Sequence, residues 1–182
     1  MLTLNQVEVP TLAPLAPKVA ELPVFNRSLR EILAERIGNV PGVAMWDVDF
    51  WPSEALVGTL RELRESWHLV TAEGRTVASC TYPGSSQART IAADGIVIRY
   101  PWDILTINEQ LVGLLSSSKI EGIVKAGAVL EGNVWLGAGS VILPGVYIEG
   151  NVVIGCNTKI GPNCYLRGNT VIGDRSEERR VG

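Results

Sequence analysis

The strongest constraint on the fold is a six-residue repeat that runs from Val124 to Asp174. Written in sixes, this segment is VKAGAV LEGNVW LGAGSV ILPGVY IEGNVV IGCNTK IGPNCY LRGNTV IGD. The first column is entirely aliphatic: Val124, Leu130, Leu136, Ile142, Ile148, Ile154, Ile160, Leu166 and Ile172. The column four residues later is small or β-branched: Ala128, Val134, Ser140, Val146, Val152, Thr158, Cys164 and Thr170. Because the side chains of these two columns recur every six residues, they can together fill a narrow, continuous core.

A third column contains only glycine and asparagine. Its members are Gly127, Asn133, Gly139, Gly145, Asn151, Asn157, Asn163 and Asn169. These two residue types adopt a positive φ most readily, so the column predicts a left-handed backbone kink every six residues.

A short strand followed by a kink, repeated every six residues, wraps the chain into a triangular prism. One hexapeptide forms each side and three form a coil, which is the left-handed parallel β-helix of hexapeptide-repeat proteins, here with three coils. Residues 18 apart then pair between coils. We therefore expect Leu130 to stack on Ile148 and Leu166, and Leu136 to stack on Ile154 and Ile172.

The chain before the repeat predicts a small α/β module over residues 1–100. In NRSLREILAERIG, Ser28 and Glu31 form a capping box and Gly38 marks the helix end. VAMWDVDF predicts one strand, and Pro52 and Ser53 open a second helix that runs to about Arg64. WHLVTAEGRTVASC predicts two strands joined by a turn.

A loop, YPGSSQARTIAADG, and a strand, IVIRY, lead to the helical segment PWDILTINEQLVGLL. We interpret residues 101–119 as a connecting helix and a seam, SSSK, that precede the β-helix of residues 120–174. The apolar side chains of the helix are expected to pack against another element: Ile104, Leu105, Leu111, Leu114 and Leu115.

Charge and hydropathy exclude some partners. The sequence has 16 basic and 19 acidic residues, a net charge of −3, so no excess of positive charge indicates a nucleic acid or an anionic membrane. No stretch approaches the roughly 20 apolar residues that a membrane span needs, and the start of the chain does not resemble a secretory signal. These observations predict a cytoplasmic protein.

Residues 96–174 resemble a known family. RYPWDILTINEQLV, the repeat and GPNCYLRG within it are similar to the linker and acyltransferase half of the bifunctional sugar-1-phosphate nucleotidyltransferase/acetyltransferases, the uridylyltransferase/glucosamine-1-phosphate acetyltransferase family. The resemblance implies N-acetylation of an amino-sugar phosphate in UDP-N-acetylglucosamine biosynthesis. It also implies acetyl-CoA as co-substrate and a homotrimer with active sites between subunits.

The N-terminal module shares less with that family. LPVFNRSLREILAERI is similar to a segment of the nucleotidyltransferase half, but residues 1–25 contain no glycine and hence no Gly-rich phosphate cradle. We interpret residues 1–100 as a reduced nucleotidyltransferase-like module without pyrophosphorylase activity. Mg²⁺ would be a cofactor only if this half were active.

Arg167 is the one candidate site residue. YLRG matches the family motif Leu-Arg-Pro, with Gly168 in place of the proline, and the resemblance implies that Arg167 holds the sugar phosphate. A guanidinium fork can grip a phosphate at two points. The alternative is a solvated outward arginine.

No catalytic or metal-binding residue is nominated. The family's general base is a histidine on a later coil, and the only histidine here is His68 in the α/β module. We therefore expect the 182-residue chain to be inactive as it stands. The alternative function is a non-catalytic β-helix scaffold or trimerisation module.

The repeat pattern of residue types ends at Asp174. Position 175 should be glycine or asparagine and position 178 aliphatic, but they are Arg175 and Glu178. RSEERRVG has one aliphatic residue with which to cover a prism end. Residues 175–182 are therefore expected to be either non-native or a disordered tail, with the native solenoid continuing past Asp174.

Overall fold

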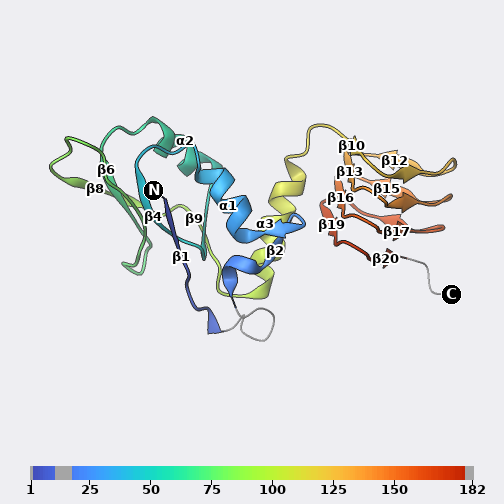
Figure 1. Cartoon of the computed structure of the whole chain (residues 1–182), viewed down its shortest axis with the longest axis horizontal. Helices are drawn as coiled ribbons and strands as arrows, with labels where there is room; N and C mark the ends of the chain where they lie inside the picture. Colours follow the sequence, from blue (N-terminus) through green and yellow to red (C-terminus); the bar gives the residue numbers. More distant parts are fainter. Residues whose placement is uncertain (1, 11–17, 179–182) are drawn as a thin grey trace. The chain divides into compact units, whose positions relative to one another are not determined.

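The computed structural model of the chain describes residues 2–10 and 18–178 (Figure 1). The chain forms two compact units, Met1–Ile104 and Leu105–Gly182. The division falls inside helix α3, Pro101–Gly113.

The N-terminal unit contains a five-stranded sheet in the order β1-β4-β7-β6-β8. Its strands are β1 (Thr3–Asn5), β4 (Val43–Asp47), β7 (Thr76–Cys80), β6 (Ser66–Val70) and β8 (Ala88–Ala92). The sheet is mixed, because β1 is parallel to β4 and β8 to β6, whereas β7 is antiparallel to both of its neighbours. Smaller elements are η2 (Val19–Glu21), the hairpin of β2 (Pro23–Val24) and β3 (Arg27–Ser28), and the pair of β5 (Phe50–Pro52) and β9 (Gly95–Val97).

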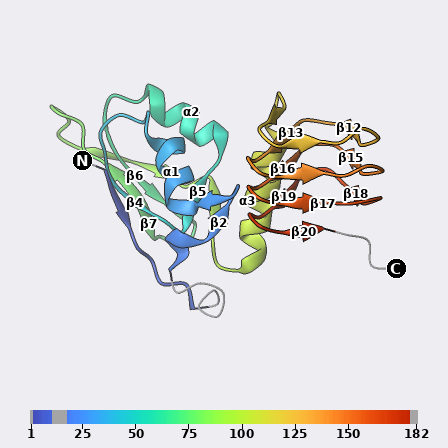
Figure 2. The same cartoon turned by 45° about the vertical axis from the view of Figure 1, so that its right-hand side comes forward.

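Two helices, α1 (Leu29–Ile37) and α2 (Glu54–Glu62), lie on one face of this sheet (Figure 2). The predicted capping box of α1 is confirmed: Ser28 Oγ accepts from the Glu31 amide at 3.3 Å, and the Glu31 carboxylate accepts from the Ser28 amide at 3.0 Å. Ser53 caps α2 by accepting from the Leu56 amide at 3.1 Å. Both helices thus begin where their polar caps satisfy free amides.

The core of the N-terminal unit is aromatic. Trp46, Trp51, Trp67 and Phe50 are fully buried. Trp46 stacks on Phe50 with ring centroids 5.8 Å apart, and its indole N–H donates to the Phe50 carbonyl at 3.0 Å. The indole donor is therefore satisfied inside an apolar core.

Two predictions for this unit are wrong in detail. VAMWDVDF forms two strands, since a turn at residues 48–49 separates β4 from β5 and directs β5 to pair with β9. The predicted loop before β9 contains β8, which pairs in parallel with β6 along five residues. An exposed edge strand rich in small and polar residues lacks the apolar alternation that would identify it from sequence.

The repeat unit consists of three parallel sheets, as the 18-residue spacing predicts. The first is β10 (Lys119–Ile120), β13 (Val134–Leu136), β16 (Val152–Ile154) and β19 (Thr170–Ile172). The second is β11 (Ile123–Val124), β14 (Val141–Ile142), β17 (Lys159–Ile160) and β20 (Glu177–Glu178). The third is β12 (Val129–Glu131), β15 (Tyr147–Glu149) and β18 (Tyr165–Leu166).

The predicted stacking is confirmed in register. Leu130 pairs with Ile148 and Ile148 with Leu166, while Leu136 pairs with Ile154 and Ile154 with Ile172. The two apolar columns of the sequence supply the core of this unit: Val134, Leu136, Ile142, Val146, Ile148, Val152, Ile154, Ile160 and Ile172. The chain is therefore a β-helix in this region, with parallel strands stacked in three sheets.

The glycine and asparagine column serves two purposes, of which only one was predicted. A positive φ occurs at Gly127, Gly139, Gly145, Asn157, Asn163 and Asn169, but not at Asn133 or Asn151. These last two asparagines instead donate side-chain hydrogen bonds to the end of α3 and to the residues just after it: Asn133 Nδ2 to the Leu115 carbonyl at 2.9 Å, and Asn151 Nδ2 to the carbonyls of Val112 and Leu115, both at 3.1 Å.

We call this pair, Asn133 and Asn151, the asparagine clamp. The Leu115 carbonyl, two residues after the end of α3, accepts from both asparagines, and the Val112 carbonyl, which already accepts from the Leu115 amide at 3.1 Å, gains a second donor from Asn151. Its two members are also linked, because the Asn133 amide donates to Asn151 Oδ1 at 3.0 Å. The prediction of a kink at both positions was wrong, because a pattern of residue types within the repeat does not show which side chains bond to a segment outside it.

Helix α3 forms as predicted, but its buried side chains differ from those expected. Leu105 and Leu114 are 68% and 66% exposed, whereas Ile107 and Val112 are buried, as is Ile104. The predicted packing of Leu105 and Leu114 was therefore wrong, and Ile107 and Val112 were missed.

The coil continues beyond the last residue that fits the sequence pattern. Arg175 adopts a φ of 56° at the position where glycine or asparagine was expected. Glu177 and Glu178 then pair in parallel with Lys159 and Ile160. The backbone of the coil thus extends to Glu178 although the residue types change after Asp174. Of the predicted tail, residues 179–182 lie outside the described residues.

Candidate functional site

Arg167, the arginine singled out from the sequence, directly follows β18 and is exposed to solvent. Its backbone is fixed locally, because its carbonyl accepts a hydrogen bond from Thr170 Oγ1 at 2.8 Å. Arg167 therefore projects a cation from an ordered corner of the β-helix.

The sheet β12-β15-β18 presents two outward columns beside Arg167. The first is Val129, Tyr147 and Tyr165, which pair in register. The second begins with Glu131 and Glu149, which also pair, and the same 18-residue spacing continues it to Arg167. Adjacent strands lie about 4.8 Å apart, so Glu149 and Arg167 are neighbours on this face. We call the five residues Tyr147, Tyr165, Glu131, Glu149 and Arg167 the tyrosine-glutamate face.

The two tyrosines of this face each bond a glutamate of the neighbouring coil. The Tyr165 hydroxyl donates to Glu149 Oε2, and this bond raises the pKa of Tyr165, while the charge of Arg167 acts in the opposite direction. The pKa of Tyr147 is raised to about 12, mainly by its hydrogen bond to Glu131. Both phenols are thus held in the neutral, donating form.

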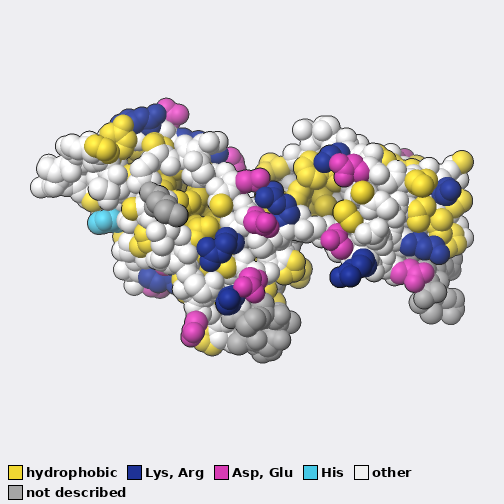
Figure 3. Space-filling view, viewed as in Figure 1, with side chains coloured by type: hydrophobic (Ala, Val, Ile, Leu, Met, Phe, Trp, Pro, Cys, Tyr) yellow, Lys and Arg dark blue, Asp and Glu magenta, His cyan; other side chains and the backbone are white. Residues whose placement is uncertain are grey.

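The tyrosine rings are accessible. Tyr147 is 36% and Tyr165 56% exposed, and their ring centroids lie 5.8 Å apart at an interplanar angle of 55°. The space-filling view shows hydrophobic side chains interspersed with charged ones over the viewed side of the repeat unit (Figure 3).

Glu149 and Arg167 do not form an ion pair with each other. Among the side chains that the structure describes, no carboxylate oxygen lies within 4.0 Å of the Arg167 guanidinium. The carboxylate of Glu149 is instead engaged by Tyr165. The guanidinium can therefore receive an external anion without first breaking a salt bridge.

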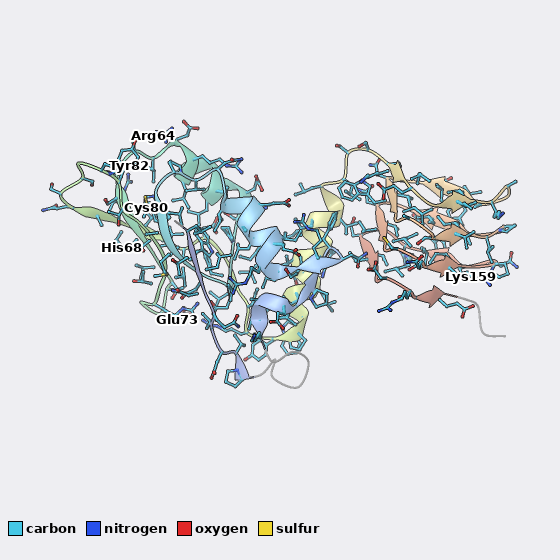
Figure 4. The ribbon with its side chains drawn as sticks, in the orientation of Figure 1. Arg64, His68, Glu73, Cys80, Tyr82 and Lys159 are labelled. Atoms are coloured by element: carbon cyan, nitrogen blue, oxygen red, sulfur yellow. The ribbon has the colours of Figure 1, made fainter. Side chains whose placement is uncertain are left out.

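His68 lies on β6 in the N-terminal unit and is exposed (Figures 3 and 4). In the described part of the chain, no group of three or more histidine, cysteine, aspartate or glutamate side chains is placed to hold a metal ion. The described residues also include no helix long and apolar enough to cross a membrane.

The N-terminal unit contains one buried ionic cluster that the sequence did not reveal. Asp49 is only 2% exposed, and Arg75 Nη2 donates to both of its carboxylate oxygens at 2.8 and 2.7 Å. Asp47, which accepts from Asn5 Nδ2 at 3.1 Å, has a pKa raised mainly by burial. Both carboxylate oxygens of Asp49 are thus engaged by Arg75, so the buried charge is not left without a partner.

Part of the repeat unit matches a known protein family. Residues 151–177 match the family of the bacterial transferase hexapeptide with six repeats. The matched segment includes β16, β17, β18, β19 and Arg167. Residues 151–177 are therefore similar to a transferase hexapeptide repeat, and this similarity favours an acyltransferase type of function. A search of curated proteins finds no match to the chain.

Proposed function

We propose that the repeat unit is a left-handed β-helix of the acetyl-CoA-dependent acyltransferases, and that it binds an amino-sugar phosphate through Arg167. Two observations support this: the match to the transferase hexapeptide family spans Arg167, and the guanidinium has no carboxylate partner among the described side chains. The arginine fork supplies bidentate hydrogen bonds to phosphate oxygens.

What favours Arg167 over Lys159 is its guanidinium fork, because neither side chain has an ion-pair partner among the residues that the structure describes. Lys159, also exposed and in the same unit, lies on β17 in a different sheet. It offers a single ammonium on a flexible stem, which is a less specific phosphate ligand. Lys159 is therefore the matched control for Arg167.

Isothermal titration of the full chain with glucosamine 1-phosphate tests this proposal. We expect Arg167→Ala to weaken binding by about tenfold or more, because a charge-assisted hydrogen bond contributes about 1.5–3 kcal/mol. Lys159→Ala should leave the affinity within about twofold of wild type. Equal loss in both variants, or no binding to the wild-type chain, would contradict a phosphate site at Arg167.

Transfer of the acetyl group is a separate matter from binding. The attacking amine must lose a proton, and histidine is the usual general base near neutral pH. The coils contain no histidine, since His68 is the only one in the sequence. We therefore expect no measurable release of free thiol from acetyl-CoA when the chain is mixed with glucosamine 1-phosphate; sustained turnover would show that another residue acts as the base.

The same proposal includes a homotrimer, in which neighbouring subunits would complete each acetyl-CoA and sugar-phosphate site. Light scattering coupled to size-exclusion chromatography measures the mass directly. The alternative, a non-catalytic scaffold or trimerisation module, is favoured if the chain trimerises but binds neither the sugar phosphate nor acetyl-CoA.

A further inference from the structure

Two opposite charges occupy neighbouring positions on the tyrosine-glutamate face without pairing. Glu149 and Arg167 lie one coil apart in the same outward column, close enough for a salt bridge between flexible side chains. The structure shows instead that Glu149 accepts the hydroxyl of Tyr165. Tyr165 thus holds the carboxylate in place and leaves the guanidinium open.

This arrangement presents a positive and a negative group to one ligand, about one strand spacing apart. A sugar phosphate with a free amine has the matching pair, a phosphate anion and an ammonium, on one small ring. A sugar phosphate with a hydroxyl in place of the amine lacks the cation. Glu149 would attract the ammonium of the aminated sugar phosphate, whereas it would not attract the hydroxylated one.

We propose that Glu149, positioned by Tyr165, makes the Arg167 site selective for aminated sugar phosphates. This inference rests on the proposed function, because it requires that Arg167 bind the phosphate group. Glu149 is the selectivity residue and Tyr165 a positioning residue. Loss of the Tyr165 hydroxyl frees Glu149 to pair with Arg167, which lowers the affinity for every sugar phosphate.

The experiment compares two ligands on the same protein. Titration calorimetry of the full chain with glucosamine 1-phosphate and with glucose 1-phosphate gives a ratio of affinities, in a buffer acidic enough to keep the amine protonated. For wild type we expect a ratio of about threefold to tenfold in favour of the amine, as for opposite charges several ångströms apart near a surface. Because both ligands meet the same folded protein, a partial folding defect cancels in the ratio.

Glu149→Gln should reduce this ratio to about one, since the amide keeps the shape and removes the charge. Glu131→Gln is the matched control, because Glu131 lies in the same column and also bonds a tyrosine, but is one coil farther from Arg167. It should retain the wild-type ratio. Tyr165→Phe should lower the affinity for both ligands, and added salt should lower the wild-type ratio.

Different results overturn the two proposals. The selectivity role of Glu149 is wrong if wild type binds both ligands equally or if Glu149→Gln keeps the preference. In either case the proposed function still holds if Arg167→Ala weakens the binding of both ligands. If neither ligand binds, the proposed function fails and the selectivity role fails with it.

Discussion

In the N-terminal unit the largest buried side chains are aromatic and come from unrelated positions, whereas in the repeat unit they are aliphatic and recur every six residues. The first core includes three fully buried tryptophans on β4, β5 and β6. The second is built from chemically similar layers 18 residues apart. The stability of the N-terminal unit therefore depends on a few large side chains, whereas that of the repeat unit is distributed over many similar contacts between coils.

The two units also differ in where their charged side chains lie and in how these are paired. The buried charge of Asp49 is neutralised by Arg75 inside the N-terminal unit. On the tyrosine-glutamate face the charged side chains are exposed, and Glu149 and Arg167 remain unpaired with each other although they are neighbours. A buried charge must have a partner to be tolerated in a folded core, while an exposed charge is available to a ligand.

The largest expected effect is the loss of one N-terminal tryptophan. Trp67→Ala removes a fully buried ring from β6 and should lower the free energy of unfolding of that unit by about 3–5 kcal/mol. Hydrogen exchange with mass spectrometry should show faster exchange in β4, β6 and β7. Equal acceleration throughout the repeat unit would show that the two units do not unfold independently.

A core substitution in the repeat unit tests whether its layers are equivalent. Ile148→Ala and Ile154→Ala each truncate a buried side chain and should each cost about 2–5 kcal/mol. The two values should agree to within about 1 kcal/mol in chemical denaturation, since both residues are stacked between coils. A much larger difference would show that each layer packs in its own way, as in the N-terminal core.

The asparagine column provides a paired test of smaller size. Asn151→Gly removes the donors to Val112 and Leu115 and should cost about 1–3 kcal/mol. Asn157→Gly keeps a backbone conformation that glycine adopts freely at a φ of 53°, and should change stability by no more than about 0.5 kcal/mol. Equal costs for the two variants would show that the asparagine clamp contributes nothing beyond backbone conformation.

The smallest effect concerns the pH dependence of Tyr147. Its pKa is raised from 10.0 to about 12, mainly by the bond to Glu131, so the folded protein holds the phenol proton more tightly than the unfolded chain does. The stabilisation is complete below pH 10.0 and is lost as the pH rises towards about 12. Ultraviolet titration should show the last tyrosine of wild type ionising near pH 12, and Glu131→Gln should move this last step to lower pH. A last titration step at the same pH in both proteins would assign the shift of Tyr147 to another cause.

The repeat was the part of the fold that the sequence predicted most fully, because each coil constrains residue types in the same columns. The pairing of Leu130 with Ile148 follows directly from that period. Strand β8 was missed because its pairing with β6 is set by tertiary contact and not by its own pattern. For the same reason the asparagine clamp was missed, since its carbonyl partners lie at the end of α3 and just after it, outside the repeat.

The candidate site was predicted only at Arg167, from a resemblance. Its neighbours Glu149 and Tyr165 could have been found by extending the 18-residue stacking to the outward columns. The bond between these two side chains could not, because rotamers decide it. The ionic pair of Asp49 and Arg75 was also hidden, since 26 residues separate its members in the chain.

The most direct test of the central claim is to map ligand binding onto the two units. In an amide NMR titration of the full chain with glucosamine 1-phosphate, we expect the largest shifts on β15, β18 and the corner at Arg167, with the N-terminal unit unchanged. Shifts confined to residues of the N-terminal sheet and its helices would contradict a sugar-phosphate site on the β-helix.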